Sequence, residues 1–501
     1  MGQEIEHDNF SAQDFEEFQQ RLLENLQGLK TLLANPDFGK GPASIGAELE
    51  LYLVDKNARP LPMNREVIGR SGHKQLALEL NRFNLEYNLS PVPAAGNPFA
   101  QLEEEMIYAI QLVNEQLAHE NGFALPIGIL PTLKRNDFGL QAMTDESRFY
   151  ALTKALQRLR GRMFCIRIDG EDPISLRSHD VTLEGANCSM QVHFRVSPSR
   201  FADTFNALQF VTPVVLALGA NSPFMLGHKL WHETRVPLFR QTIDGRTHEE
   251  CERALPSRVD FGNGWVREGA YELFAEAVRL YEPILPVVGK ERIDELINQG
   301  KMPVLNELRL HTGTIWPWNR AVYDANDGGH LRVEMRALPS GPTPIDMIAN
   351  TAFALGAAKG LQDQMEEIIP ALPFATQASN FYLAAEKGIQ ADLMWPDLNK
   401  PGGLLKKNVI DIAAELLPIA EQGLQQLGVD EAEVKKYLGV IKQRLDKKIS
   451  GAVWQRREYH RQLKQKSEHA ALTAMVQGYM KYSSMNIPVA EWEDVAGQDE
   501  K

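Results

Sequence analysis

Carboxylates stand two positions apart in a short segment near the N-terminus. Glu48 and Glu50 lie in residues 45–54 (IGAELELYLV), where apolar and polar side chains alternate. Alternate residues of a β-strand point to one face, so these carboxylates would lie side by side, with Cα atoms about 6.5–7 Å apart. Like charges this close repel each other unless a cation or an arginine lies between them. Hard cations such as Mg²⁺ prefer oxygen ligands of this kind.

Three further segments share this design, with one apolar face and one face of ionisable or amide groups. Lysine is absent from all four polar faces, although a face that only contacts water usually includes Lys, Thr and Ser. The alternative is an antiparallel sheet with one solvated side, which is common. If the strands share a sheet, the pattern favours one surface of carboxylates and arginines. The groups are Glu86 in residues 85–89, Gln191, His193 and Arg195 in residues 191–196, and Arg332, Glu334 and Arg336 in residues 331–338.

Helical and strand-like segments surround these four strands. Apolar residues recur with helical spacing over residues 12–33, which predicts a helix. From about residue 44 to 339, short strand patterns alternate with helices and loops. The loops near residues 226–266 and 310–330 are long, polar and contain several Trp and His residues. Long loops of this kind are often functional.

From Asp346 onward the pattern is almost wholly helical. Residues 404–428 and 431–466 have the spacing of amphipathic helices, and the basic residues of the second are interpreted as a solvated helix face. The sequence therefore predicts an α+β fold with a helical C-terminal extension. The predicted regions are an N-terminal helical segment (1–43), a catalytic domain (44–368) and a C-terminal helical region (369–501).

Composition places the chain among ordinary globular proteins. Of 501 residues, 44% are hydrophobic and 24% are charged, which argues against disordered and fibrous classes. The formal net charge is −13, and an acidic protein does not favour nucleic acid or anionic lipid as a partner. We therefore expect no nucleic-acid or membrane partner.

The cysteines and the apolar stretches of the sequence favour a cytoplasmic protein without a membrane-spanning helix. The three cysteines form no CxxC pair, which fits a reducing compartment and a cytoplasmic location. Residues 1–10 are acidic and polar, unlike a signal peptide. Residues 211–226 are the most apolar stretch, but they are interrupted and too short to span a bilayer, so they predict a buried helix.

Common nucleotide and nucleophile motifs are absent from the sequence. It contains no GxxxxGK[ST] loop and no Gly-x-Ser-x-Gly elbow. Gly262 and Gly264 begin a glycine pattern, but Arg267 stands where a third glycine would be needed. An enzyme that binds nucleotide without a glycine loop needs metal ions and arginines, which the four strands offer.

The motifs in their order resemble one family, the bacterial carboxylate–amine ligases and glutamate–cysteine ligases. GAELE (46–50) resembles the GxExE strand of that family, and HLRVEMRALPSGPTPID (330–346) resembles its late strand. ELNRFNLEYNLSP (79–91), FGNGWVR (261–267) and HTGTIWPWNR (311–320) resemble further segments. The resemblance covers about residues 44–351 and implies the glutamine synthetase-like fold, in which helices cover a curved antiparallel sheet.

The resemblance also implies a set of site residues and cofactors. ATP would be bound through two or three Mg²⁺ ions, with Mn²⁺ as an alternative ion, and Arg336 would act with Glu334 on the phosphoryl group in transfer. Arg235, Arg332 and Arg195 would bind substrate. Gln191 stands where many members have the first His of a His-x-His strand, which leaves open whether Gln191 or His193 contacts metal. The implied metal ligands are Glu48, Glu50, Glu79, Glu86, Glu334, Gln191 and His193.

Several of the residues singled out above could instead have a purely structural role. A structural role requires no substrate and is common for these residue types. The alternatives are a helix surface for Glu79, an ion pair with Glu334 for Arg332, core or loop anchors for Trp316 and Trp318, and a small buried hydrophobe for Cys188.

The predicted function is an ATP-dependent ligase of the glutamate–cysteine ligase type. ATP would phosphorylate the γ-carboxylate of glutamate, and an amine, most consistently cysteine, would displace phosphate to give γ-glutamylcysteine, as in glutathione biosynthesis. The alternatives are a ligase for another carboxylate or amine, and a catalytically silent regulator that binds nucleotide or amino acid. A homo-oligomer is a further option, since helical tails often pack between subunits.

Overall fold

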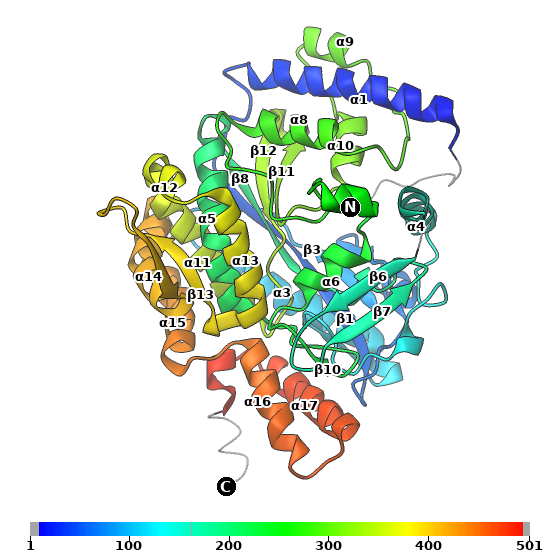
Figure 1. Cartoon of the computed structure of the whole chain (residues 1–501), viewed down its shortest axis with the longest axis vertical. Helices are drawn as coiled ribbons and strands as arrows, with labels where there is room; N and C mark the ends of the chain where they lie inside the picture. Colours follow the sequence, from blue (N-terminus) through cyan, green and yellow to red (C-terminus); the bar gives the residue numbers. More distant parts are fainter. Residues whose placement is uncertain (1–9, 162, 494–501) are drawn as a thin grey trace.

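The largest sheet carries all four strands that the polar pattern singled out. The computed structural model describes residues 10–161 and 163–493, so the predictions for the first residues and the last acidic ones lie outside it (Figure 1). Within the described residues this sheet has eight strands, all paired antiparallel. They are β1 (Ser44–Asp55), β2 (Leu76–Leu78), β3 (Asn84–Asn88), β4 (Val92–Pro93), β5 (Gly122–Leu125), β8 (Met190–Val196), β11 (Asn319–Asp324) and β12 (His330–Met335).

The order β11-β12-β8-β1-β3-β2 brings the polar groups of distant segments together. Glu334 lies opposite His193 across β12 and β8, and Gln191 lies opposite Glu48 across β8 and β1. Glu50 pairs directly with Glu86 of β3. Side chains directly opposite in a sheet have Cβ atoms about 4.5–5.5 Å apart, so one face becomes a continuous polar surface.

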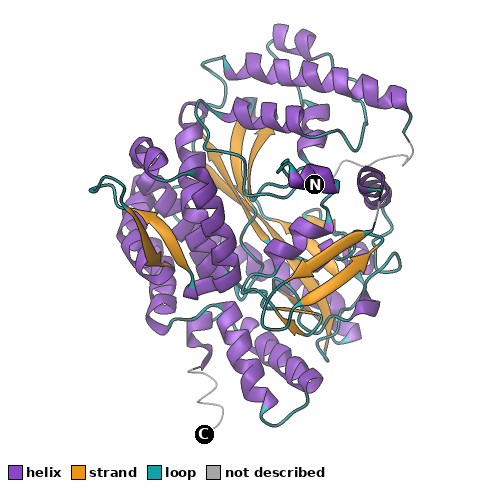
Figure 2. Cartoon of the chain, in the orientation of Figure 1, coloured by secondary structure: helices purple, strands orange, loops and turns teal. Residues whose placement is uncertain are grey.

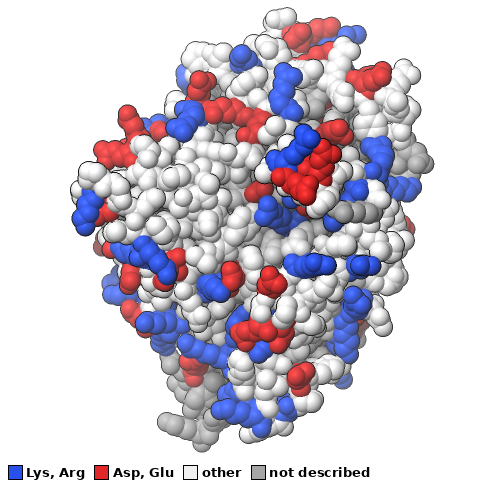
Figure 3. All heavy atoms as spheres, viewed as in Figure 1, with Lys and Arg blue, Asp and Glu red and all other residues white. Residues whose placement is uncertain are grey.

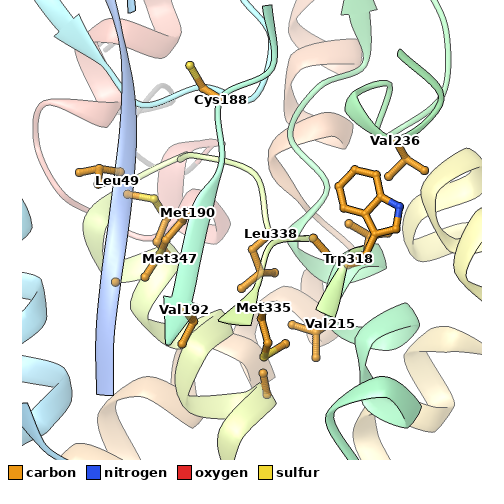
Figure 4. Close-up of a cluster of buried hydrophobic side chains, with 14 of the residues drawn as sticks. Leu49, Cys188, Met190, Val192, Val215, Val236, Trp318, Met335, Leu338 and Met347 are labelled. Carbon is orange, nitrogen blue, oxygen red and sulfur yellow. The ribbon is translucent and has the colours of Figure 1, made fainter. Parts of the chain in front are cut away.

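The other face of the sheet packs on two long apolar helices, α5 (Phe201–Gly219) and α11 (Pro344–Leu361). Figure 4 shows Leu49, Val192 and Met335 from three strands in one cluster with Val215 of α5 and Met347 of α11. All five side chains are almost fully buried. Each such side chain contributes roughly 1.5–3 kcal/mol relative to an exposed one, so the apolar face fixes which way the carboxylates point.

Helix α5 confirms the predicted buried helix, with different limits. It ends at Gly219, and a short strand β9 (Phe224–Met225) pairs with β10 (His228–Lys229) after it, so the helix is shorter than residues 211–226 at its C-terminal end. Residues 198–219 are long and apolar enough to cross a membrane, but 89% of the apolar 18-residue window within them is buried inside the protein. The helix belongs to the core.

Short elements lie over the polar face of the sheet. The two segments predicted as long loops also contain regular elements, including helices α6 (Arg235–Thr242) and α7 (His248–Glu252) in the first and strand β11 in the second, and the prediction is wrong for these residues. Figure 2 shows the hairpin of β6 and β7 and its neighbouring helices in front of the sheet. The elements in this part are α4 (Ser147–Arg160), β6 (Phe164–Ile168), β7 (Ile174–Ser178), the 3₁₀ turn η3 (Glu184–Ala186), α6 (Arg235–Thr242), α7 (His248–Glu252) and α10 (Asn306–Thr312).

The N-terminal segment forms the predicted helix α1 (Ala12–Leu33), with a capping box between Ser11 and Asp14. It packs on α8 (Ala270–Leu280), α9 (Ile293–Asn298) and α10. Arg21 of α1 contacts Glu307 of α10 at 3.3 Å. Two further helices, α2 (Asn64–Ser71) and α3 (Pro98–Leu117), pack on each other near β1.

The C-terminal region is helical apart from one hairpin. The predicted helix over 404–428 begins five residues later, because β14 pairs with β13, and the predicted helix over 431–466 is divided at Lys448. Helices α14 and α15 pack on α11, so this region shares the central core. The elements are α12 (Met365–Ala371), α13 (Phe374–Lys387), β13 (Asp392–Pro396), β14 (Leu404–Asn408), α14 (Val409–Gln426), α15 (Glu431–Lys447), α16 (Gly451–Leu463) and α17 (Glu468–Ser483).

Candidate active site

A cavity of about 340 Å³ opens over the polar face of the sheet. Its floor comes from β1, β3 and β8, and its walls come from α4, α6, α10 and η3. Cavities of this size suit small molecules, and the mixture of charged and apolar walls suits a phosphorylated ligand with an organic part. The charged lining residues are Glu48, Glu50, Glu79, Glu86, Glu184, Arg148, Arg309, Arg320 and Arg336, and the larger apolar ones include Phe149, Leu152, Phe239, Leu310 and Trp316.

The carboxylates form two clusters, each with ligand atoms from three residues within 4.8 Å of one another. The first cluster is Glu48, His193 and Glu334, and the second is Glu50, Glu79 and Glu86. Three carboxylates match the oxygen preference of Mg²⁺, and two carboxylates with one imidazole also suit Mn²⁺. The donor sets therefore fit the divalent ions that the sequence predicts.

The first cluster favours ionised carboxylates. His193 Nε2 lies 3.1 Å from Glu48 and 3.8 Å from Glu334. Burial of Glu48 opposes ionisation, but His193 outweighs it and lowers the pKa of Glu48 to about 2. Burial also opposes ionisation of Glu334, yet Arg320 and Arg336 hold the pKa of Glu334 well below its usual range. These carboxylates are charged at neutral pH and ready to bind a cation.

The second cluster is under electrostatic repulsion. Burial, with Glu48 as a smaller cause, raises the pKa of Glu86 to about 7. Burial and then the Glu86 carboxyl raise the pKa of Glu79 well above its usual value. Burial raises the pKa of Glu50 despite hydrogen bonds from Ser189. Three carboxyl groups held this close without a cation are unfavourable, and a bound divalent ion would remove the repulsion.

Gln191 and His193 take different positions on the same strand. The Gln191 amide donates to Glu50 over 2.9 Å, and its oxygen accepts a hydrogen bond from Arg336. Both ends of the amide are thus occupied by protein groups. His193 faces two carboxylates, so the geometry favours His193 over Gln191 as the metal ligand.

Arg336 lies between the two clusters. One of its nitrogens lies 3.0 Å from Glu334 Oε1 and also donates to Gln191. The guanidinium lines the cavity, where its planar fork can bind a phosphate. Arg320 of the neighbouring strand binds both oxygens of Glu334, with Nη2 at 3.1 Å from Oε1. Glu334 therefore orients two arginines at the cavity wall.

Arg320 was not singled out from the sequence. It ends the HTGTIWPWNR segment, which the prediction treated as a loop, but it lies in β11, which begins at Asn319. Buried and partly buried residues alternate over Asn319–Asp324 in the structure, but the sequence NRAVYD shows no clean alternation of apolar and polar residues, so the strand left little signal. Arg148, Arg309 and Glu184 also line the cavity without having been predicted.

The three arginines predicted to bind substrate do not line this cavity. Arg235 is buried, and its Nη1 lies 3.2 Å from Glu233 and 3.1 Å from the Ala337 carbonyl. Arg332 pairs with Asp324 at 3.3 Å, instead of with Glu334 as its structural alternative proposed. Arg195 donates to the Lys40 carbonyl over 3.0 Å. These groups already have protein partners, so the geometry of this cavity does not support the expected substrate role, which stays a prediction.

The structure also places the residues for which the sequence left a structural role open. Glu79 follows β2 and faces the second cluster, so it does not lie on a helix surface. Trp316 lines the cavity, whereas Trp318 is buried against Phe239 in the core. Cys188 is a buried free thiol, as predicted.

Comparison with known proteins agrees with this geometry. The model of glutamate–cysteine ligase family 2 matches residues 44–475. A Frankia alni protein described as a candidate glutamate–cysteine ligase 2-1 is 23% identical over 391 residues, which are 76% of this chain and 83% of that protein. The crystal structure of glutamate–cysteine ligase from Francisella tularensis in complex with AMP superposes with a TM-score of 0.51 at 13% identity, covering 92% of this chain and 94% of that one.

The structural match confirms the predicted α+β fold, a glutamine synthetase-like curved antiparallel sheet covered by helices. The family match spans most of the sequence, including the residues of both carboxylate clusters. The protein is therefore an ATP-dependent carboxylate–amine ligase, and the chain belongs to glutamate–cysteine ligase family 2.

Proposed function

We propose that the protein couples the γ-carboxylate of glutamate to an amine, with cysteine as the first choice, and forms γ-glutamylcysteine, ADP and phosphate. The observation that carries the proposal is the position of Arg336, which pairs with Glu334 of the first cluster and lines one cavity with Glu48 and with all three carboxylates of the second cluster. In this arrangement, metal ions held by the carboxylates would bind the triphosphate, and Arg336 would bind the phosphoryl group in transfer.

The two clusters would hold one divalent ion each, Mg²⁺ or Mn²⁺. When bound, such ions would neutralise the charge of the ATP phosphates and the charge that develops during transfer. Glu334 and Gln191 hold the Arg336 guanidinium in a fixed orientation, so little reorganisation is needed when the phosphoryl group arrives. Trp316, Phe149 and Leu310 give the cavity apolar walls that limit access of water to an acyl phosphate.

The reaction then has two balanced steps. A γ-carboxylate oxygen of glutamate bonds to the γ-phosphorus of ATP while the bond to ADP breaks, which gives an acyl phosphate. The amine, having lost one proton, bonds to the acyl carbon, and phosphate leaves with the electron pair of the C–O bond. The nitrogen loses a second proton as the adduct collapses, which leaves a neutral amide.

The choice of substrates rests on family membership, and product analysis tests it. Purified protein would be incubated with ATP, Mg²⁺ and glutamate together with cysteine or another amino acid or amine, and products identified by mass spectrometry. We expect γ-glutamylcysteine as the fastest-formed amide. A different amide, or one from another acid, would keep the ligase chemistry and replace the proposed substrates.

A further inference from the structure

Glu184 is a carboxylate of the cavity that neither cluster includes. It lines the cavity, and the residue as a whole is partly exposed. Its side chain forms no hydrogen bond or ion pair with any residue in the described ranges 10–161 and 163–493. A carboxylate without a partner at the edge of a low-dielectric pocket is unfavourable unless a ligand supplies a donor or a cation.

The backbone on both sides of Glu184 is held firmly. Asn81 donates to the Thr182 carbonyl over 2.9 Å, and the Tyr52 hydroxyl donates to the Ala186 carbonyl over 2.5 Å. Gly185 packs so closely on Asn81 that an added Cβ would lie 2.5 Å from the Asn81 amide. Tyr52 comes from the same strand as Glu48 and Glu50, so the turn is fixed relative to the clusters. A fixed turn with a free carboxylate is typical of a binding group.

The charged neighbours of Glu184 locate it within the proposed reaction. Its carboxyl lies within electrostatic range of Glu50, Glu79 and Arg336. Burial, with Glu50 as a smaller cause, raises the pKa of Glu184 to about 8, so a cationic ligand beside the carboxyl would favour its ionised form. It is not, however, among the three residues whose ligand atoms lie within 4.8 Å of one another in the second cluster. Glu184 thus lines the same cavity as Arg336, the group proposed to bind the phosphoryl, and lies outside the proposed metal ligands.

We propose that Glu184 binds the ammonium group of the acceptor amine. This inference rests on the proposed function, in which Arg336 binds the phosphoryl group of the acyl phosphate. The acyl carbon is separated from that phosphorus by a single oxygen, so a carboxylate that shares this small cavity with Arg336 is placed near the site of attack. The α-ammonium of glutamate is several bonds farther along the chain. Glu184 selects acceptors that arrive as cations and holds the nitrogen beside the acyl carbon.

The variant Glu184→Gln tests this role because it keeps the shape and removes the charge. We expect the KM for cysteine, or for whichever charged amine the wild type prefers, to rise about tenfold or more, as for loss of a charge-assisted hydrogen bond. The KM values for ATP and glutamate should stay within about twofold. Turnover of hydroxylamine, an acceptor that is uncharged at neutral pH, should be nearly unchanged.

The control variant is Glu146→Gln, which removes a carboxylate that pairs with Arg65 at 2.7 Å and does not line the cavity. All its kinetic constants should match the wild type. Three results for Glu184→Gln would overturn the inference: an unchanged KM for the charged acceptor, an equal loss with hydroxylamine, or weaker binding of Mn²⁺. A rise in the KM for glutamate alone would assign Glu184 to that substrate instead. A wild type without ADP release under any condition would remove the proposed function, and this inference with it.

Discussion

Glu86 shows most directly how much folding stability the metal-free site loses. Its folded-state pKa of about 7 lies above the ordinary value of 4.5, so the group favours the folded state below about pH 4.5 and loses this contribution as pH rises through about 7. We predict that Glu86→Gln raises the Tm of the metal-free protein at pH 8, since it removes the cost of a buried charge, together with its repulsion by Glu48, of roughly 3 kcal/mol in all. Thermal unfolding in EDTA at pH 5 and pH 8 measures this. Equal Tm values for variant and wild type at pH 8 would contradict the prediction.

Arg320 provides a test of the arginine pair on Glu334. Arg320→Ala leaves Glu334 with Arg336 and His193 and loosens the orientation of Arg336. We expect kcat to fall about 100-fold, a typical loss for one preorganised donor. Arg332→Ala is the matched control, because Arg332 pairs with Asp324 outside the cavity, and kcat should stay within about twofold. Equal effects of the two substitutions on kcat would argue against a role for Arg320.

The predicted site residues differ in how far sequence alone could place them. Glu48, Glu50 and Glu334 were placed on one face because strand periodicity sets the direction of alternate side chains. Glu184 lies in a turn with no periodic pattern, so its position depends on hydrogen bonds from Asn81 and Tyr52. The pairing of Arg235 with Glu233 and a distant carbonyl is likewise tertiary and leaves no local signal.

At the scale of elements, strands and helices with clear periodicity were predicted well. Helix α1 has the predicted limits, and β1 differs from its prediction by one residue at each end. The hairpin of β13 and β14 was missed because residues 404–408 run without a break into a helical pattern. Asn408, whose side chain caps α14, was the local sign that the helix begins later.

The link between the C-terminal helices and the central core has a buried ion pair at its centre. Arg444 of α15 lies 2.7 Å from Asp346 of α11, and both side chains are at most 1% exposed. We predict that Arg444→Ala destabilises the protein by about 3–5 kcal/mol, because it leaves a buried carboxylate unpaired. Urea unfolding measures the change.

The control for this pair is Arg457→Ala, which removes an exposed ion pair with Glu493. It should shift the unfolding midpoint very little, since exposed pairs contribute about 0–1 kcal/mol. If Arg444→Ala were as harmless as this control, residues 369–501 would be less closely tied to the core than the contacts indicate.

At the scale of the whole molecule, the charges do not gather in one patch on the face shown in Figure 3. Basic and acidic side chains are interspersed there, while the chain as a whole carries a net charge of −13. This distribution agrees with a small-molecule enzyme. Cytoplasmic location, oligomeric state and the absence of nucleic-acid or membrane partners stay predictions. Composition could bound these properties, but it does not determine the contacts between separate chains.

The central claim is that metal ions held by the two carboxylate clusters activate glutamate with ATP. The most direct measurement is ADP release by wild type and by Glu334→Gln, with glutamate and an amine, in Mg²⁺ and in EDTA. We predict glutamate-dependent release in Mg²⁺ for the wild type, none in EDTA, and a loss of about 100-fold or more in the variant at an unchanged fold. Release by Glu334→Gln at the wild-type rate, or equal release in EDTA, would contradict the claim.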